Sequence, residues 1–296
     1  MEELFSQKTI QEWIKSSRLT IIIGHFGTGK TEVAVNMALN LGEMGIPFTL
    51  ADLDVVDPYF RSRECAELIR RAGGRLITSS QACMDADVPS MPAEAASVFD
   101  DTERYAVMDI GGDASGARVL AQYRHKIGSD ARVLAVLNAN RPMTPDAGAM
   151  VSYIRSIEEA AGLKITGLIN NTHLCGETTE EDIIRGADMA REAAEITGIQ
   201  LMAHTVDERL LERLTVQQSP AEKSSTEQPV AGQSAELPKT ESDHNSGKSP
   251  CAGNSRQAEK EKNNSSRSCC EKQVEALRNR LHINDRELII PIKIYM

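Results

Sequence analysis

One segment of the chain carries residues suited to binding a triphosphate. Residues 24–31 read Gly-His-Phe-Gly-Thr-Gly-Lys-Thr, which matches the phosphate-loop pattern G-x-x-x-x-G-K-[ST]. Glycines let backbone N–H groups turn inward around phosphate oxygens, and the N-terminus of a following helix adds about half a positive charge. Lys30 is expected to reach the β- and γ-phosphates, and the Thr31 hydroxyl is expected to ligate Mg²⁺. The residues predicted to bind the nucleotide are Gly24, His25, Phe26, Gly27, Thr28, Gly29, Lys30 and Thr31.

The residues on either side of the loop favour this interpretation over an ordinary glycine-rich turn. Residues 20–23 (Thr-Ile-Ile-Ile) form an apolar run typical of a buried strand, and residues 32–38 follow a helical pattern. A strand before the loop and a helix after it are the context in which the pattern binds phosphate. The flanking sequence therefore predicts a phosphate site.

Two further strand ends carry carboxylates that could organise Mg²⁺ and water. One predicted strand ends in Asp52-Leu53-Asp54, and another, residues 105–108, runs into Asp109-Ile-Gly-Gly. An apolar strand ending in Asp and a small turn is the Walker B pattern, so Asp109 is predicted to hold the metal shell. Asp54 is predicted to orient the attacking water or a metal-bound water. The alternative for each carboxylate is that it caps the next helix.

The pattern of elements that must position these residues predicts an α/β fold. Short apolar runs at residues 19–23, 48–53, 105–110, 133–138, 165–170 and 199–203 alternate with amphipathic stretches at 31–43, 146–161 and 181–197. Runs without strict alternation are typical of strands buried on both faces. We therefore predict a mostly parallel sheet with helices on both faces, the Rossmann-like three-layer sandwich of a P-loop NTPase. In such sheets ligands bind at the carboxyl edge of the strands.

Composition divides the chain into four parts. We predict an N-terminal helix at 1–18, a P-loop nucleotide-binding domain at 19–215, a low-complexity insertion at 216–270, and a helix and final strand at 271–296 that complete the same domain. The insertion contains no aromatic residue and is dominated by Ser, Glu, Lys, Gln, Asn and Pro, which predicts disorder. Pro291 in the final strand indicates a sheet edge or a break.

Net charge and cysteine usage exclude several other classes. The formal charge of −10 argues against general nucleic-acid binding, and no apolar run is long enough to predict a membrane span. The acidic first residues lack the layout of a secretory signal. The six cysteines show no C-x-x-C spacing, which favours reduced thiols and a cytoplasmic location.

These residues together resemble the MinD/ParA/CobQ-CobB-type P-loop nucleotide-binding proteins. The resemblance rests on the loop at 24–31, the Asp52-x-Asp54 strand end, the segment 109–112 and the late strand 166–171. It implies binding of ATP with Mg²⁺, slow hydrolysis, and often a dimer whose state depends on nucleotide. Members usually carry a lysine at the second loop position that reaches the partner's phosphates. That position is His25 here, which counts against a lysine-bridged homodimer.

The resemblance also bears on the base. Related GTPases read guanine with an Asn-Lys-x-Asp segment after a late strand, where this chain has Asn170-Asn171-Thr172-His173 without the Asp. The resemblance implies that an asparagine there contacts adenine, with Asn170 favoured, and that ATP is preferred to GTP. Turn chemistry after a strand is the alternative for these asparagines. Residues 138–142 end another strand, where they either shape the nucleotide site or form an ordinary loop.

Three functions remain open from the sequence. The first is an ATPase whose nucleotide state acts as a switch on a partner protein. The second is a metabolic enzyme of the CobB or dethiobiotin-synthetase kind, which phosphorylates a small carboxylate. The third is a nucleotide-binding adaptor that does not hydrolyse ATP. Lys30, Asp54 and Asp109 are the predicted catalytic residues, and Thr31, Asp54 and Asp109 are the predicted metal ligands.

Overall fold

The described part of the chain folds around one parallel sheet. The computed structural model describes residues 7–53, 62–78, 93–111, 114–211 and 287–293. Within these ranges eight strands lie in the order β3-β2-β4-β1-β5-β6-β7-β8, and every neighbouring pair is parallel. Their bounds are β1 (Leu19–Gly24), β2 (Phe48–Leu53), β3 (Arg75–Thr78), β4 (Tyr105–Ile110), β5 (Arg132–Leu137), β6 (Gly167–Asn170), β7 (Leu201–Asp207) and β8 (Leu288–Ile292).

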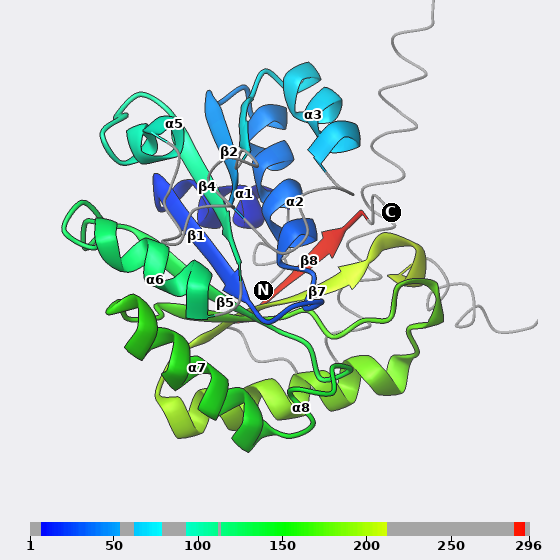
Figure 1. The fold of residues 1–296 in the computed structure, drawn as a ribbon. Coiled ribbons are helices and arrows are strands. Elements are labelled where there is room, and N and C mark those ends of the chain that lie inside the picture. The colour runs from blue at the N-terminus through cyan, green and yellow to red at the C-terminus, as the bar shows by residue number, and fades with distance from the viewer. Residues whose placement is uncertain (1–6, 54–61, 79–92, 112–113, 212–286, 294–296) are drawn as a thin grey trace, which may run out of the picture.

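Helices cover both faces of this sheet (Figure 1). One face carries α1 (Gln7–Lys15), α2 (Lys30–Glu43) and α3 (Ser62–Arg71), and the other carries α6 (Ala114–Tyr123), α7 (Ala147–Ala161) and α8 (Glu180–Thr197). Short pieces α5 (Ala93–Ala96), η2 (Ser97–Phe99) and η3 (Cys175–Glu177) complete the described elements. The predicted α/β fold of a P-loop NTPase is thereby confirmed.

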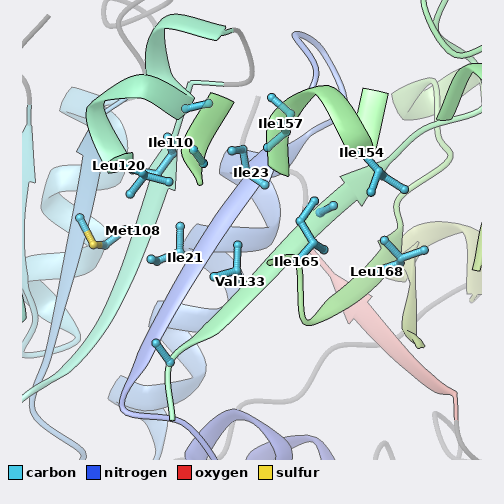
Figure 2. Packing of buried hydrophobic residues seen from close by; sticks show 14 of the residues in the cluster. Ile21, Ile23, Met108, Ile110, Leu120, Val133, Ile154, Ile157, Ile165 and Leu168 are labelled. Atoms are coloured by element: carbon cyan, nitrogen blue, oxygen red, sulfur yellow. The ribbon is translucent and has the colours of Figure 1, made fainter. Parts of the chain in front are cut away.

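The core has two layers because successive strand residues point to opposite faces. Ile21 and Ile23 of β1 pack with Leu120 of α6 and Ile154 of α7 (Figure 2), whereas Ile22 packs on the opposite layer beneath α2. All of these side chains are buried. Burial on both faces explains why the strands read as continuous apolar runs.

The starts of the strands agree closely with the sequence. The six strands expected from apolar runs are all present, and each begins within two residues of its predicted start. The strand β3 was not among them, because only Ile77 of its four residues is buried.

Helix α8 begins at a capping box, in which the Thr179 side chain accepts from the N–H of Asp182 while the Asp182 carboxylate accepts from the N–H of Thr179.

The last strand, β8, is an edge strand of the sheet. It pairs only with β7 among the described strands, and Pro291 lies opposite Val206 in that pairing. A proline is tolerated at an edge because it has no N–H to donate to a second neighbour. Beyond the strand, the Asn36 side chain of α2 donates to the carbonyl of Lys293 and accepts from its N–H, both over 3.0 Å. These bonds connect the end of β8 to the helix that follows the phosphate loop.

Several predicted features lie outside the described residues. They are the 216–270 insertion, the helix expected after residue 271, and Asp54. None of the helices in the described ranges combines the length and apolar character needed to cross a membrane.

Candidate phosphate-binding site

The phosphate loop joins the carboxyl end of β1 to the start of α2, at the centre of the sheet. Gly27 and Gly29 have φ angles of +75° and +79°, in the left-handed region that side chains other than glycine disfavour. A Cβ on Gly24 would lie 2.6 Å from Thr28 Oγ1 and 2.8 Å from the carbonyl oxygen of Val136. The loop therefore needs glycine at these three positions. This tight backbone curl is the kind that directs successive N–H groups at a bound anion.

Thr31 and Asp109 meet at the base of the loop. The Thr31 hydroxyl donates to Asp109 Oδ2 over 2.6 Å. Strand β4 lies beside β1 with Asp109 opposite Ile22, so the carboxylate faces the α2 side of the sheet. Both Asp109 (1% exposed) and Lys30 (5% exposed) are buried. A hydroxyl and a carboxylate in contact fit the donor set of Mg²⁺, which protein sites hold with one or two carboxylates and substrate phosphates.

Asp52 belongs to the same edge. It lies opposite Asp109 in the pairing of β2 with β4, so the two carboxyl groups stand on one face of the sheet. Asp54, the predicted water-orienting residue, follows the end of β2 and lies outside the described residues. Its role stays a prediction.

The amide of Asn171, just after β6, clamps the loop. Its Nδ2 donates to the carbonyl of Thr28 over 2.6 Å, and its Oδ1 accepts from the Thr205 hydroxyl of β7. A Cβ on Gly29 would lie 2.3 Å from Asn171 Nδ2. The Asn171 side chain thus joins the segment after β6 to the phosphate loop and to strand β7.

Asn170 has different partners from Asn171. It is 2% exposed; its Oδ1 accepts from the Thr172 hydroxyl over 2.6 Å, and its Nδ2 bonds His204 Nδ1 over 3.1 Å. The sequence favoured Asn170 as the base contact, but the structure brings Asn171, not Asn170, to the loop. Neighbouring strand residues point to opposite faces, so only one of the pair can do so.

Asn170 is the first member of a buried polar chain. His204 Nε2 bonds Glu287 Oε2 over 2.9 Å, and Arg191 Nε lies 3.6 Å from the same oxygen. Burial lowers the pKa of His204 from 6.5; the hydrogen bond and charge of Glu287 oppose this, and the charge of Arg191 adds to it. With Nδ1 accepting from Asn170, the neutral ring carries its proton on Nε2. This chain links β6, β7 and the residue before β8.

His173 lies against the loop from the same side as Asn171. A Cβ on Gly29 would lie 3.1 Å from His173 Nε2, and His173 Nδ1 accepts from the N–H of Cys175 over 3.2 Å. In the neutral ring the proton therefore lies on Nε2, the nitrogen beside the loop. Sequence reasoning did not assign this histidine a role.

His25 and Phe26, neighbours in the loop, have different environments. The His25 ring packs on Tyr153 of α7 with centroids 5.2 Å apart and a 50° tilt. Phe26 is 61% exposed. His25 is therefore engaged within its own chain, at the loop position where the resemblance leads one to expect a lysine that reaches a partner.

Arg141, from the turn after β5, lies beside the middle of the loop. A Cβ on Gly27 would lie 3.1 Å from both Cζ and Nε of this arginine. The sequence placed residues 138–142 near the site without a specific role. The contact could not be anticipated because it depends on β5 lying next to β1 in the sheet.

Comparisons with known proteins gave matches among solved structures only. No protein-family model and no curated protein sequence matches it. Among solved structures, FlhF complexed with GTP and Mg²⁺ is 14% identical with a TM-score of 0.41, covering 66% of this chain and 71% of that one. FtsY from Thermotoga maritima is 18% identical with a TM-score of 0.41, covering 68% and 70%. The signal recognition particle 54 kDa protein from Aeropyrum pernix K1, in complex with GDP, is 19% identical with a TM-score of 0.41, covering 63% and 40%.

Proposed function

We propose that this chain binds a nucleoside triphosphate with Mg²⁺ at residues 24–31 and hydrolyses it. The observation that carries the proposal is the 2.6 Å hydrogen bond between Thr31 of the loop and Asp109 of β4. It joins the two residues that a phosphate loop and a Walker B strand contribute to one metal ion. Mg²⁺ bound there would neutralise phosphate oxygens and polarise the γ-phosphoryl group.

Lys30 and the loop backbone supply the rest of the phosphate contacts. Lys30 begins α2, so its charge and the helix N-terminus act on the same anion. Asp109 holds the Thr31 hydroxyl in place and keeps a negative charge facing the metal position. Asp54, next to Leu53 at the end of β2, is proposed to orient the attacking water. These roles make Lys30, Asp54 and Asp109 the proposed catalytic residues.

We propose ATP as the nucleotide. Because Asn171 is the residue bonded to the loop, the segment to compare with Asn-Lys-x-Asp is Asn171-Thr172-His173-Leu174. Its fourth residue, Leu174, is 38% exposed and has no carboxylate to accept from a guanine N–H. The segment therefore lacks the Asp in this register as well as in the one that begins at Asn170. Asn170 supports this segment from inside rather than contacting the base.

We further propose that nucleotide state controls a partner protein, and that the chain works without a lysine-bridged homodimer. The packing of His25 on Tyr153 of the same chain supports the second point. For the first point, residues 54–61 directly follow β2 in the chain, and we propose that they respond to the γ-phosphate of the bound nucleotide.

The test is ATP turnover by the purified chain, measured with ATP and with GTP, in wild type and in Lys30→Ala. Turnover of ATP without added substrate, lost in Lys30→Ala, is the expected result. Turnover that requires a small carboxylate would favour a phosphorylating enzyme in place of the switch. Equal turnover by wild type and Lys30→Ala would remove the assignment of the site altogether, and a preference for GTP would overturn the choice of ATP.

A further inference from the structure

The turn after β5 holds Arg141 in a fixed place beside the loop. The Thr144 hydroxyl donates to the carbonyl of Asn138 over 2.8 Å, and the Thr144 N–H donates to the carbonyl of Arg141 over 3.0 Å. Asn138 in turn donates through Nδ2 to the carbonyl of His173 over 3.2 Å. The two hydrogen bonds of Thr144 thus fix the backbone of the turn, and the bond from Asn138 connects the turn to the segment after β6.

The guanidinium of Arg141 rests directly on the phosphate loop. The distance of 3.1 Å from a Cβ position on Gly27 to Arg141 Cζ and Nε, and of 3.4 Å to Nη1, leaves no room for another atom between them. Gly27 lies midway between Gly24, where β1 ends, and Lys30, where α2 begins. The guanidinium is therefore within reach of whatever anion the loop N–H groups surround.

The charge of Arg141 has no carboxylate partner among the described residues. Its Nε is buried without a hydrogen-bond partner there. Two other arginines of the described residues are each paired: Arg185 contacts Asp182 over 2.9 Å, and Arg209 contacts Asp207 over 2.7 Å. A buried guanidinium N–H without an acceptor costs free energy that a bound anion would recover. In a chain of net charge −10, this arginine is placed to meet an anionic ligand.

We propose that Arg141 contacts the phosphates of the bound nucleotide and supplies, from within the same chain, the second cation of the loop. This inference rests on the proposed function. It also accounts for the histidine at the second loop position: with His25 packed on Tyr153, the additional positive charge comes from the turn after β5 instead of from a partner subunit. Arginine suits this position because its planar fork presents several N–H donors to phosphate oxygens and is always charged.

The test is calorimetric titration of Mg-ATP into wild type, Arg141→Met, Arg141→Lys and Lys30→Ala. Methionine keeps most of the stem that packs on Gly27 and removes the charge, so affinity should fall roughly ten- to a hundredfold, the range for one hydrogen bond to a charged group. Lysine should restore part of the loss. Loss of the phosphate contact should also make the affinity of Arg141→Met less sensitive to KCl than that of wild type.

A matched control is Arg124→Met, because Arg124 is exposed and lies in the connection that enters the opposite, amino end of β5. It should bind as wild type does. Arg141→Met with wild-type affinity, while Lys30→Ala loses binding, would overturn the role of Arg141 and leave the proposed function intact. Failure of wild type itself to bind Mg-ATP or Mg-GTP would overturn both. If Arg141→Met unfolds at a lower temperature than wild type, Arg141→Gln replaces it in the same titrations, and unchanged affinity there overturns the inference equally.

Discussion

Thr31 at the start of α2 donates a 2.6 Å hydrogen bond to Asp109 at the end of β4, joining positions 78 residues apart in the chain. The bond forms because β4 lies directly beside β1, so the Walker B strand ends next to the helix that follows the loop. It puts the hydroxyl and the carboxylate at the place where a phosphate loop holds its metal ion.

Removing the Thr31 hydroxyl should therefore weaken Mg²⁺-dependent function. Thr31→Ala is expected to lower turnover at saturating ATP by roughly ten- to a hundredfold, because a hydrogen bond to a charged group contributes about 1.5–3 kcal/mol. Thr31→Ser keeps the hydroxyl and should stay close to wild type. The measurement is a Mg²⁺ titration of ATP turnover. Thr31→Ala that needs no more Mg²⁺ than wild type, and turns over as fast, would contradict the metal role.

Gly29 should tolerate no side chain. In Gly29→Ala the φ of +79° strains the backbone, and the new Cβ would lie 2.3 Å from Asn171 Nδ2. The variant should therefore lose nucleotide binding, and its free energy of unfolding should fall by more than the backbone strain alone would cause. Gly45→Ala is the matched control, because Gly45 has a φ of +69° and open space around a Cβ. It should cost only about 1–2 kcal/mol of left-handed strain and leave binding unchanged. Urea unfolding and calorimetry of the two variants give the comparison, and equal effects would refute this account.

The two adjacent asparagines should separate in function. Each makes buried hydrogen bonds, so Asn170→Ala and Asn171→Ala should each lower the free energy of unfolding by about 1–3 kcal/mol. Only Asn171→Ala should in addition weaken Mg-ATP binding by a large factor, because only Asn171 bonds the loop. Calorimetry at a temperature where both variants are folded decides this. A greater loss of affinity in Asn170→Ala would instead restore Asn170 as the base contact.

His204 should make stability depend on pH on the acid side. Its pKa is lowered from 6.5 in the folded chain, chiefly by burial. Below about pH 6.5 the unfolded histidine binds a proton that the folded one refuses, so the free energy of unfolding falls as pH drops, by at most about 1.4 kcal/mol per pH unit for one proton. Above that pH the histidine is neutral in both states and adds no dependence.

Urea unfolding of wild type and His204→Gln between about pH 8 and about pH 5 isolates this contribution. The polar and charged groups around His204 are Asn170, Glu287 and Arg191, and a Gln amide at this position can still donate to Glu287. The variant should lose less stability on acidification than wild type does. Parallel pH profiles would show that His204 is not the titrating group.

Much of the fold could be predicted because its signals are local. The apolar runs of β1, β2 and β4 are buried on both faces and bounded by turn residues, and the loop between β1 and α2 carries a fixed pattern. Pro291 indicated a sheet edge or a break because it lacks an N–H, and β8 is an edge strand. By contrast, β3 gave little signal, since its exposed ends and single buried Ile77 do not form an apolar run.

The site was harder to predict from the sequence, because two of its contacts depend on tertiary geometry. The choice between Asn170 and Asn171 depends on which face of β6 each residue occupies, and a shift of one residue reverses the answer. The contact of Arg141 with Gly27 depends on β5 being the neighbour of β1, which strand order along the chain does not reveal. That Thr31 and Asp109 lie together could be predicted, because each belongs to a motif with its own local pattern.

The most direct test of the central claim is a crystal structure of the chain with Mg²⁺ and a non-hydrolysable ATP analogue. The account predicts that residues 24–29 surround the β-phosphate, that Lys30 contacts the β- and γ-phosphates, and that Mg²⁺ is bound to Thr31 with Asp109 next to it. An analogue bound elsewhere, or bound at the loop with its phosphates away from Lys30, would contradict it.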